Sequence, residues 1–225
     1  MEKNMDMLLC DNVSFTYTGG GRALTGINLR CAEGGYTLVT GPSGAGKSTL
    51  FRLLVRLEEP ASGTIFFRGV PVSEYPPTVL RRRIMLMPQI PALFPGTVRE
   101  TLLLPWTFAR HKECSRPGDA RLTEWLECLQ LSEIGLEENA AELSVGQRQR
   151  LCLIRCLLLE PEVLLLDEPT SALDAESRRL VLETVRDRHL NHGMTVLQID
   201  HSGYIPAFPH TRYVMKAGTL ERTNG

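Results

Sequence analysis

The sequence predicts an α/β fold built on a mostly parallel sheet with helices packed against it. Three short apolar runs, of the kind that is buried on both faces of such a sheet, occur at residues 36–40, 163–167 and 195–199. Segments with apolar residues at helical spacing lie between them. Open parallel sheets place their ligands at the carboxyl ends of the strands, so the residues that follow these runs are the first candidates for a functional site.

The remaining elements follow from periodicity and from turn residues. Strands are expected, in chain order, at residues 8–15, 26–30, 36–40, 64–67, 84–87, 163–167 and 195–199, with a closing hairpin around 216–218. Helices are expected from residue 48 onward, at 98–103, at 122–129, from 144 to the proline at 161, and at 175–190. The part from 97 to about 143 is therefore a mostly helical insertion.

A glycine-rich segment directly follows the first buried run. It consists of Gly41, Pro42, Ser43, Gly44, Ala45, Gly46, Lys47, Ser48 and Thr49. Its spacing fits a loop whose backbone N–H groups turn inward around a phosphate, at the positive end of the helix that follows. Lys47 would reach the terminal phosphates, and the Ser48 hydroxyl would be an oxygen ligand for Mg²⁺. The alternative is a glycine-rich turn that matches this spacing by accident.

Two adjacent carboxylates, Asp167 and Glu168, end the second buried run. Because side chains alternate across a strand, we expect Asp167 to hold magnesium while Glu168 faces the γ-phosphate and polarises an attacking water. The alternative is a strand end that carries two solvated acids.

A third segment begins the helix that precedes this run. It consists of Leu143, Ser144, Val145, Gly146 and Gln147. Ser144 is a good N-cap. We expect its hydroxyl, with free N–H groups of Gly146 and Gln147, to form a second anion site. The alternative is that a helix simply begins here.

Together these segments resemble the ATP-binding subunits of bacterial ABC transporters, from about Met7 to Glu221. The resemblance implies a P-loop NTPase fold of the ABC ATPase type, with a RecA-like core, an antiparallel β N-terminal subdomain and a helical subdomain. It implies one domain over residues 1–225, with the core at about 7–95 and 160–221 and the helical subdomain at about 96–159.

The resemblance also assigns roles to single residues. Gln89 and His201 match positions that act with the catalytic Glu168, and Gln89 also senses magnesium. Tyr17 is similar to the aromatic residue that stacks on adenine. Asp174 matches a loop that braces the phosphate loop of a second subunit.

Two residues depart from the family pattern. Val145 stands where a glycine is usual, and Asp200 stands where Thr or Ser usually precedes the histidine. We expect the Val145 side chain to point away from the nucleotide, and Asp200 to change the tautomer or pKa of His201.

The family further implies ATP and Mg²⁺ as ligands and a homodimer that pairs head to tail, so that Ser144 of one copy closes over the ATP held by Lys47 of the other. It implies a multi-span membrane permease as a separate chain. The segment at 89–106 is similar to the corresponding segment of a small bacterial group of ABC proteins associated with iron export.

Composition limits the other functions that the chain can have. It has 225 residues and a net charge of −1, which argues against direct nucleic-acid binding. Arg81, Arg82 and Arg83 form the one local basic cluster and are interpreted as a solvated helix end. No run approaches a spanning helix and the start lacks a signal peptide, which predicts a cytoplasmic protein, peripheral on the inner membrane. The alternative function is a soluble ABC ATPase that acts as a mechanical clamp on a protein or nucleic-acid complex.

Overall fold

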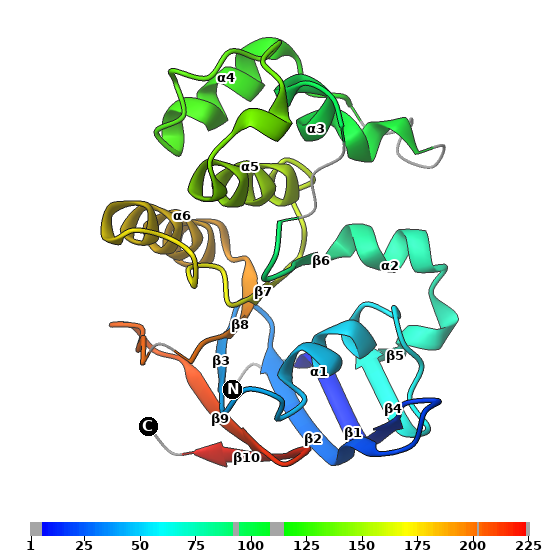
Figure 1. Cartoon of the computed structure of the whole chain (residues 1–225). Coiled ribbons are helices and arrows are strands. Elements are labelled where there is room, and N and C mark those ends of the chain that lie inside the picture. Colours follow the sequence, from blue (N-terminus) through cyan, green and yellow to red (C-terminus); the bar gives the residue numbers. More distant parts are fainter. Residues whose placement is uncertain (1–5, 92–94, 109–114, 202, 224–225) are drawn as a thin grey trace.

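The computed structural model describes residues 6–91, 95–108, 115–201 and 203–223. These residues form two sheets and a group of helices (Figure 1). The four-stranded antiparallel sheet has the order β2-β1-β4-β5, and the six-stranded sheet has the order β10-β9-β3-β8-β7-β6. In the larger sheet, β6, β7, β8, β3 and β9 run parallel, and β10 returns antiparallel to β9.

The strands are β1 (Asp6–Thr16), β2 (Arg22–Ala32), β3 (Tyr36–Thr40), β4 (Ser62–Phe67), β5 (Val70–Pro71), β6 (Ile84–Met87), β7 (Val163–Asp167), β8 (Thr195–Ile199), β9 (Thr211–Lys216) and β10 (Thr219–Thr223). The helices are α1 (Lys47–Leu54), α2 (Pro77–Arg83), α3 (Val98–Leu103), α4 (Asp119–Cys128), α5 (Val145–Leu157) and α6 (Ala175–His192). Short 3-10 turns are η1 (Val72–Glu74), η2 (Leu104–Thr107) and η4 (Ala140–Glu142). In the described ranges, no helix is both long and apolar enough to cross a membrane.

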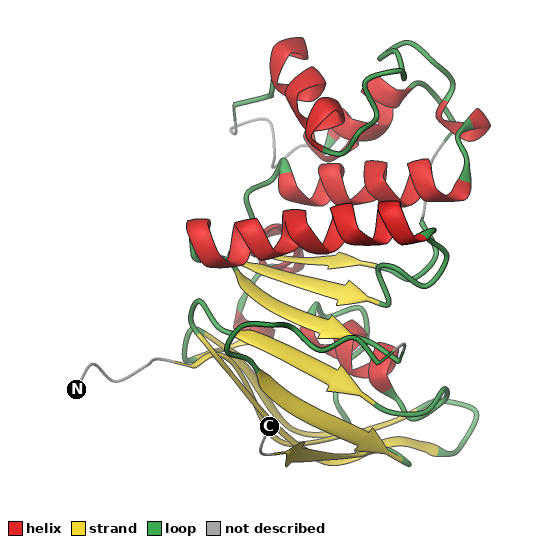
Figure 2. Ribbon diagram, turned by 90° about the vertical axis from the view of Figure 1, so that its left-hand side faces the viewer, coloured by secondary structure: helices red, strands yellow, loops and turns green. Residues whose placement is uncertain are grey.

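The six-stranded sheet has an apolar core on each face. Successive side chains of a buried strand point to opposite faces and so belong to different cores. Leu164 and Leu166 of β7 pack with α5, α6 and the helices α3 and α4. Val163 and Leu165 pack on the other face with α1 and the antiparallel sheet. Figure 2 shows α5 and α6 lying along one side of the strands. Helices α1 and α5 therefore lie on opposite faces of the sheet.

The buried strands have the predicted bounds, because apolar side chains on both faces fix them. Strands β1 and β2 are longer than predicted, since they pair with each other through several register shifts beyond their apolar segments. The predicted hairpin is confirmed, with Ala217 and Gly218 at positive φ in its two-residue turn.

The basic cluster at the end of α2 is not simply solvated, as the sequence had suggested. Arg81 donates to the backbone carbonyls of Val55 and Arg56 beyond the end of α1. Arg83 pairs with Glu162, which also accepts from Arg68. The cluster therefore ties α2 to its neighbours, which a count of charges along the sequence cannot reveal.

Candidate functional site

The glycine-rich loop joins β3 to α1 and depends on its glycines for shape. Gly41, Gly44 and Gly46 have φ values of 148°, 76° and 105°, a region that residues with a Cβ rarely adopt. A Cβ on Gly41 would collide with the carbonyl of Met215, and one on Gly46 would lie 2.8 Å from the carbonyl of Ala23. The loop is therefore wedged against its neighbours in a shape that only glycine permits.

Lys47 is buried at the start of α1, with its ammonium turned back over this loop. Its Nζ donates to the carbonyls of Gly41 and Pro42, both at 2.9 Å. The positive charge thus lies beside the free N–H groups at the first turn of the helix, where an anion is favoured. This is the geometry that a phosphate-binding loop requires.

Asp167 and Ser48 meet beside Lys47. Asp167 ends β7 and is buried, and burial is the main cause that raises the pKa of its carboxyl group, although a hydrogen bond from Ser48 lowers it. Within the described residues, Asp167 Oδ1 is buried without a hydrogen-bond partner. A buried carboxylate oxygen without a partner, next to a hydroxyl, suits a hard cation such as Mg²⁺.

Glu168 lies just beyond β7, not within it. Its φ is 51°, and its N–H donates to the Ile199 carbonyl at 3.2 Å. The prediction that Asp167 and Glu168 alternate as strand residues is therefore wrong for Glu168, because the strand ends one residue earlier. The left-handed backbone turns its side chain toward two polar partners.

Those partners are Gln89 and His201. Gln89 Nε2 donates to Glu168 Oε2 at 2.6 Å, and His201 Nδ1 lies 3.0 Å from Glu168 Oε1. Strands β6, β7 and β8 are adjacent and in register, so residues just beyond their carboxyl ends converge. The structure thus brings together the three residues that the sequence had assigned to catalysis.

Asp200 lies in the turn after β8. Its N–H donates to the Val39 carbonyl, and its buried carboxylate accepts the N–H of Tyr204 at 3.2 Å. Asp200 therefore caps the turn after β8, while the Nδ1 atom of its neighbour His201 faces Glu168.

The segment at 143–147 starts α5 as expected, but two of its backbone N–H groups have partners within the segment. The Ser144 hydroxyl accepts the N–H of Gln147 at 3.3 Å, and Gln147 Oε1 accepts the N–H of Ser144 at 2.8 Å. This reciprocal capping box means that the N–H of Gln147 is not free, contrary to the expectation. The Ser144 hydroxyl acts as an acceptor in this box, so its own O–H can still donate to an anion.

Asp174 and Gln149 organise the segment that follows Glu168. Asp174 caps α6, and its Oδ1 accepts the N–H of Ser177 at 2.9 Å, which holds its pKa below the ordinary value. Gln149, fully buried in α5, donates to the Pro169 carbonyl at 3.1 Å. Sequence reasoning missed Gln149, although a polar residue among the apolar positions of a helix was a usable signal.

Tyr17 lies just beyond β1 with 40% of its surface exposed. Its hydroxyl is 2.7 Å from Thr49 Oγ1, and its ring meets the edge of Phe15 with centroids 4.9 Å apart. The exposed ring is thus connected to α1, close to the phosphate loop.

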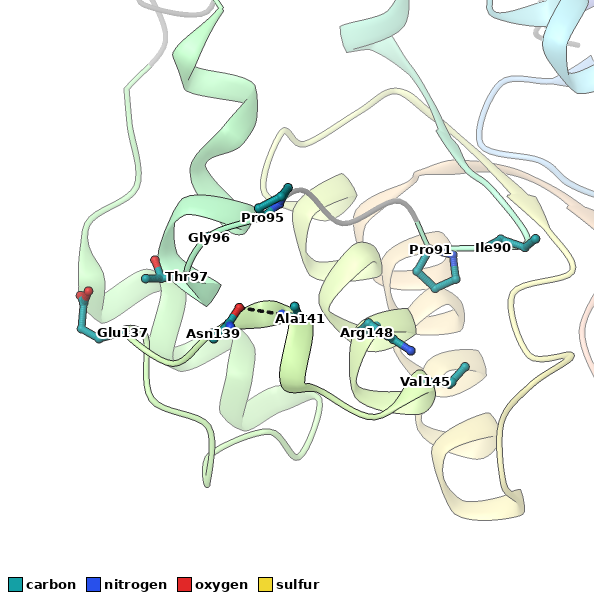
Figure 3. Close-up of a pocket in the computed structure, with 10 residues that line it drawn as sticks. All are labelled: Ile90, Pro91, Pro95, Gly96, Thr97, Glu137, Asn139, Ala141, Val145 and Arg148. Atoms are coloured by element: carbon teal, nitrogen blue, oxygen red, sulfur yellow. Dashed lines mark hydrogen bonds between the residues drawn. The ribbon is translucent and has the colours of Figure 1, made fainter.

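A cavity of about 810 Å³ opens between the segment after Gln89 and the start of α5 (Figure 3). Ile90, which is 80% exposed, and Val145, which is 46% exposed, both line it. Val145 therefore contributes to this cavity. The other lining residues are Pro91, Pro95, Gly96, Thr97, Glu137, Asn139, Ala141 and Arg148.

Comparison with known proteins agrees with this geometry. Residues 24–171 match the family model of ABC transporters. The chain is 38% identical over 201 residues to the "Probable iron export ATP-binding protein FetA" of Escherichia coli (strain K12), covering 89% of this chain and 87% of that protein.

Two solved structures have the same fold. The cbiO1 protein of Clostridium perfringens, part of the ABC transporter complex cbiONQ, has a TM-score of 0.80 and 27% identity, covering 96% of this chain and 87% of that one. A dimeric ATP-binding cassette in a post-hydrolysis state, with ADP and Pi bound, has a TM-score of 0.82 and 27% identity, covering 97% and 100%. This chain belongs to the ABC transporter family and is an ATP-binding, ATP-hydrolysing subunit.

Proposed function

We propose that two copies of this chain enclose ATP and Mg²⁺ head to tail, with the phosphate loop of one copy facing Ser144 of the other. The observation that carries this proposal is the position of α1 and α5 on opposite faces of the six-stranded sheet. A segment at the start of α5 is thus poorly placed to close over the phosphate loop of its own chain. The dimeric cassette with ADP and Pi supports the same arrangement.

In this proposal the phosphates bind the loop at residues 41–46 and the ammonium of Lys47, which exchanges its two carbonyl partners for phosphate oxygens. Ser48, Asp167 and Gln89 would hold the magnesium ion. The ion neutralises charge on the phosphates and so stabilises the transition state.

Glu168 polarises the attacking water. Both of its carboxylate oxygens are engaged in the described structure, by Gln89 and by His201. Each carboxylate oxygen has a further lone pair, so Glu168 can accept a hydrogen bond from a water while it keeps these partners. His201 orients that water together with Glu168 and contacts the γ-phosphate.

The partner that we propose is a multi-span membrane permease, with this chain bound on the cytoplasmic face of the inner membrane. The cavity beside Gln89 is the surface that fits this role, because Ile90 exposes an apolar side chain there directly next to a catalytic residue. The cbiO1 protein, part of a transporter complex, supports a separate permease.

For the cargo we propose iron, moved outward, and the support is the likeness to FetA over most of both chains. The test is the iron content of cells in which this chain is deleted or carries Glu168→Gln, compared with wild type under iron excess. We expect a higher iron content in both strains. Unchanged iron would discard this cargo but would leave the ATPase assignment intact.

A soluble clamp is the competing function. Co-purification in detergent separates the two, since a transport subunit is recovered with a multi-span membrane protein and a clamp is not.

A further inference from the structure

Three contacts hold Tyr17, one through its backbone and two through its side chain. Its carbonyl accepts the N–H of Gly20 at 3.0 Å in a turn, its ring meets the edge of Phe15, and its hydroxyl is 2.7 Å from the Thr49 hydroxyl. The first two contacts lie within the same stretch of chain. The contact with Thr49 is the long-range one, spanning 32 residues, and it fixes the ring relative to α1.

The chain beside Tyr17 gives the ring little support. It continues through Thr18 and three glycines at 19–21, all exposed, and Gly20 and Gly21 have positive φ values of 84° and 99°. A Cβ on any of these three glycines would meet nothing within 4 Å. Glycines in open space have the largest conformational freedom, so the orientation of Tyr17 depends strongly on its side-chain contacts.

Thr49 is in the opposite situation. It is buried in the first turn of α1, two residues after Lys47 and one after Ser48. Its position is therefore set by the same helix start that sets the phosphate loop. The hydrogen bond between the hydroxyls of Thr49 and Tyr17 therefore fixes the position of the ring relative to the phosphate loop.

We infer that Thr49 is the positioning residue of the base subsite: its hydroxyl holds the Tyr17 ring in the orientation that stacks on the nucleotide base. This inference rests on the proposed stacking of adenine on Tyr17. A ring that is already ordered loses less conformational entropy when the base binds. Thr49 therefore raises the affinity for the base although it does not contact the base. The contribution belongs to the base, so it is absent for a ligand that has phosphates alone.

The test uses Tyr17→Phe, which keeps the ring and removes its hydroxyl, alone and combined with Thr49→Val. Calorimetry measures dissociation constants for magnesium ADP, which is not hydrolysed, and for inorganic pyrophosphate, which lacks the base. We expect Tyr17→Phe to weaken ADP binding by about two- to tenfold, the usual net worth of one hydrogen bond. We expect no change for pyrophosphate, and no further effect of Tyr17→Phe once Thr49→Val is present.

Tyr75→Phe is the matched control. It also removes one tyrosine hydroxyl, which donates to the Phe67 carbonyl in the antiparallel sheet region, and we expect it to leave ADP binding unchanged. A general loosening of that region would weaken ADP and pyrophosphate binding together and would overturn the inference. An equal effect of Tyr17→Phe with and without Thr49 would also overturn it.

Tyr17→Ala separates this inference from the function on which it rests. Loss of the stacked ring should weaken ADP binding by about ten- to a hundredfold. If Tyr17→Ala weakens binding and Tyr17→Phe does not, the ring stacks without help from Thr49 and the inference fails alone. If Tyr17→Ala has no effect, adenine does not stack on Tyr17, and the proposed base subsite fails with it.

Discussion

The two halves of the proposed ATP site differ in how their polar groups are satisfied. At the carboxyl edge of the six-stranded sheet, a buried Asp167 oxygen has no hydrogen-bond partner among the residues that the structure describes, and Glu168 has a left-handed backbone conformation. The start of α5 has neither feature, because Ser144 and Gln147 satisfy each other in a capping box. One half is strained and ready for ligands, whereas the other is locally relaxed.

This difference indicates that the two halves of the proposed site contribute to ATP binding and hydrolysis in different ways. Unsatisfied or strained groups persist only where the surrounding fold enforces them, and they are typical of sites that bind or react. A capped helix start does not need a ligand to satisfy these groups, so its contribution to ATP binding comes from the Ser144 O–H, which the capping box does not use as a donor. We infer that the sheet edge binds and reacts, while Ser144 closes the site reversibly.

The largest effect is expected from Glu168→Gln, which removes the proposed general base and keeps the shape of the side chain. ATP turnover should fall by about a hundredfold or more, because general base catalysis contributes that much. ATP binding should persist and closed dimers should accumulate, as measured by phosphate release and by size-exclusion chromatography with light scattering.

Glu183→Gln is the control for this change. It removes a carboxylate from an exposed pair with Arg179, and such a pair contributes little to stability. Turnover should stay at the wild-type value. If Glu168→Gln also hydrolysed ATP normally, the reactive half of the site would lie elsewhere.

The next largest effect is expected from Ser144→Ala, which tests the Ser144 hydroxyl as a donor to phosphate. The variant loses an N-cap, and it also loses a donor to phosphate, so turnover should fall by about tenfold or more. Thr97→Ala removes the matching capping box of α3. It should cost about 1 kcal/mol of unfolding free energy, as Ser144→Ala does, without a loss of turnover in the isolated chain.

Urea unfolding and phosphate release, measured on both variants, separate the two effects. Equal turnover losses in Ser144→Ala and Thr97→Ala would mean that capping alone matters. Ser144 would then affect turnover only as a helix cap, and the difference between the two halves of the site would have no role in ATP hydrolysis.

A smaller effect is expected from pH, acting through Asp167. Burial raises the pKa of its carboxyl group, so protons compete with the metal at a higher pH than for an ordinary aspartate. The gain in ADP affinity on adding Mg²⁺ should therefore shrink as pH falls through this raised pKa, by at most about tenfold per pH unit for one proton. Calorimetry with and without the metal, on wild type and Asp167→Asn, measures it.

The raised pKa of Asp167 also predicts how the stability of the chain depends on pH. Because its folded pKa lies above its unfolded pKa, its contribution to stability is greatest at low pH and is lost as pH rises. Asp167→Asn should therefore raise the melting temperature of the metal-free chain at neutral pH. A lower melting temperature would show that the carboxylate is stabilised by its neighbours and is not waiting for a cation.

The sequence predicts the sheet edge better than it predicts the contacts around it. Buried strands and the glycine spacing are visible as patterns, and these patterns place Glu168 at the sheet edge. Gln89 and His201 were assigned to the same site by the resemblance to ABC ATP-binding subunits. The backbone turn at Glu168 and the cap made by Asp200 depend on where a strand ends in three dimensions. Local periodicity does not carry that information.

The smallest effect is expected from Val145→Gly, which restores the residue usual at this position in the family. Val145 is exposed in the cavity beside Ile90, so its side chain is not needed by the nucleotide. Val and Gly differ by only a few tenths of a kcal/mol in helix propensity, so turnover of the isolated chain should change by less than about threefold. Val145 adjoins Ser144. A tenfold rise in turnover would therefore show that the methyl groups of Val145 obstruct closure of the site, and that the start of α5 limits the rate of ATP hydrolysis.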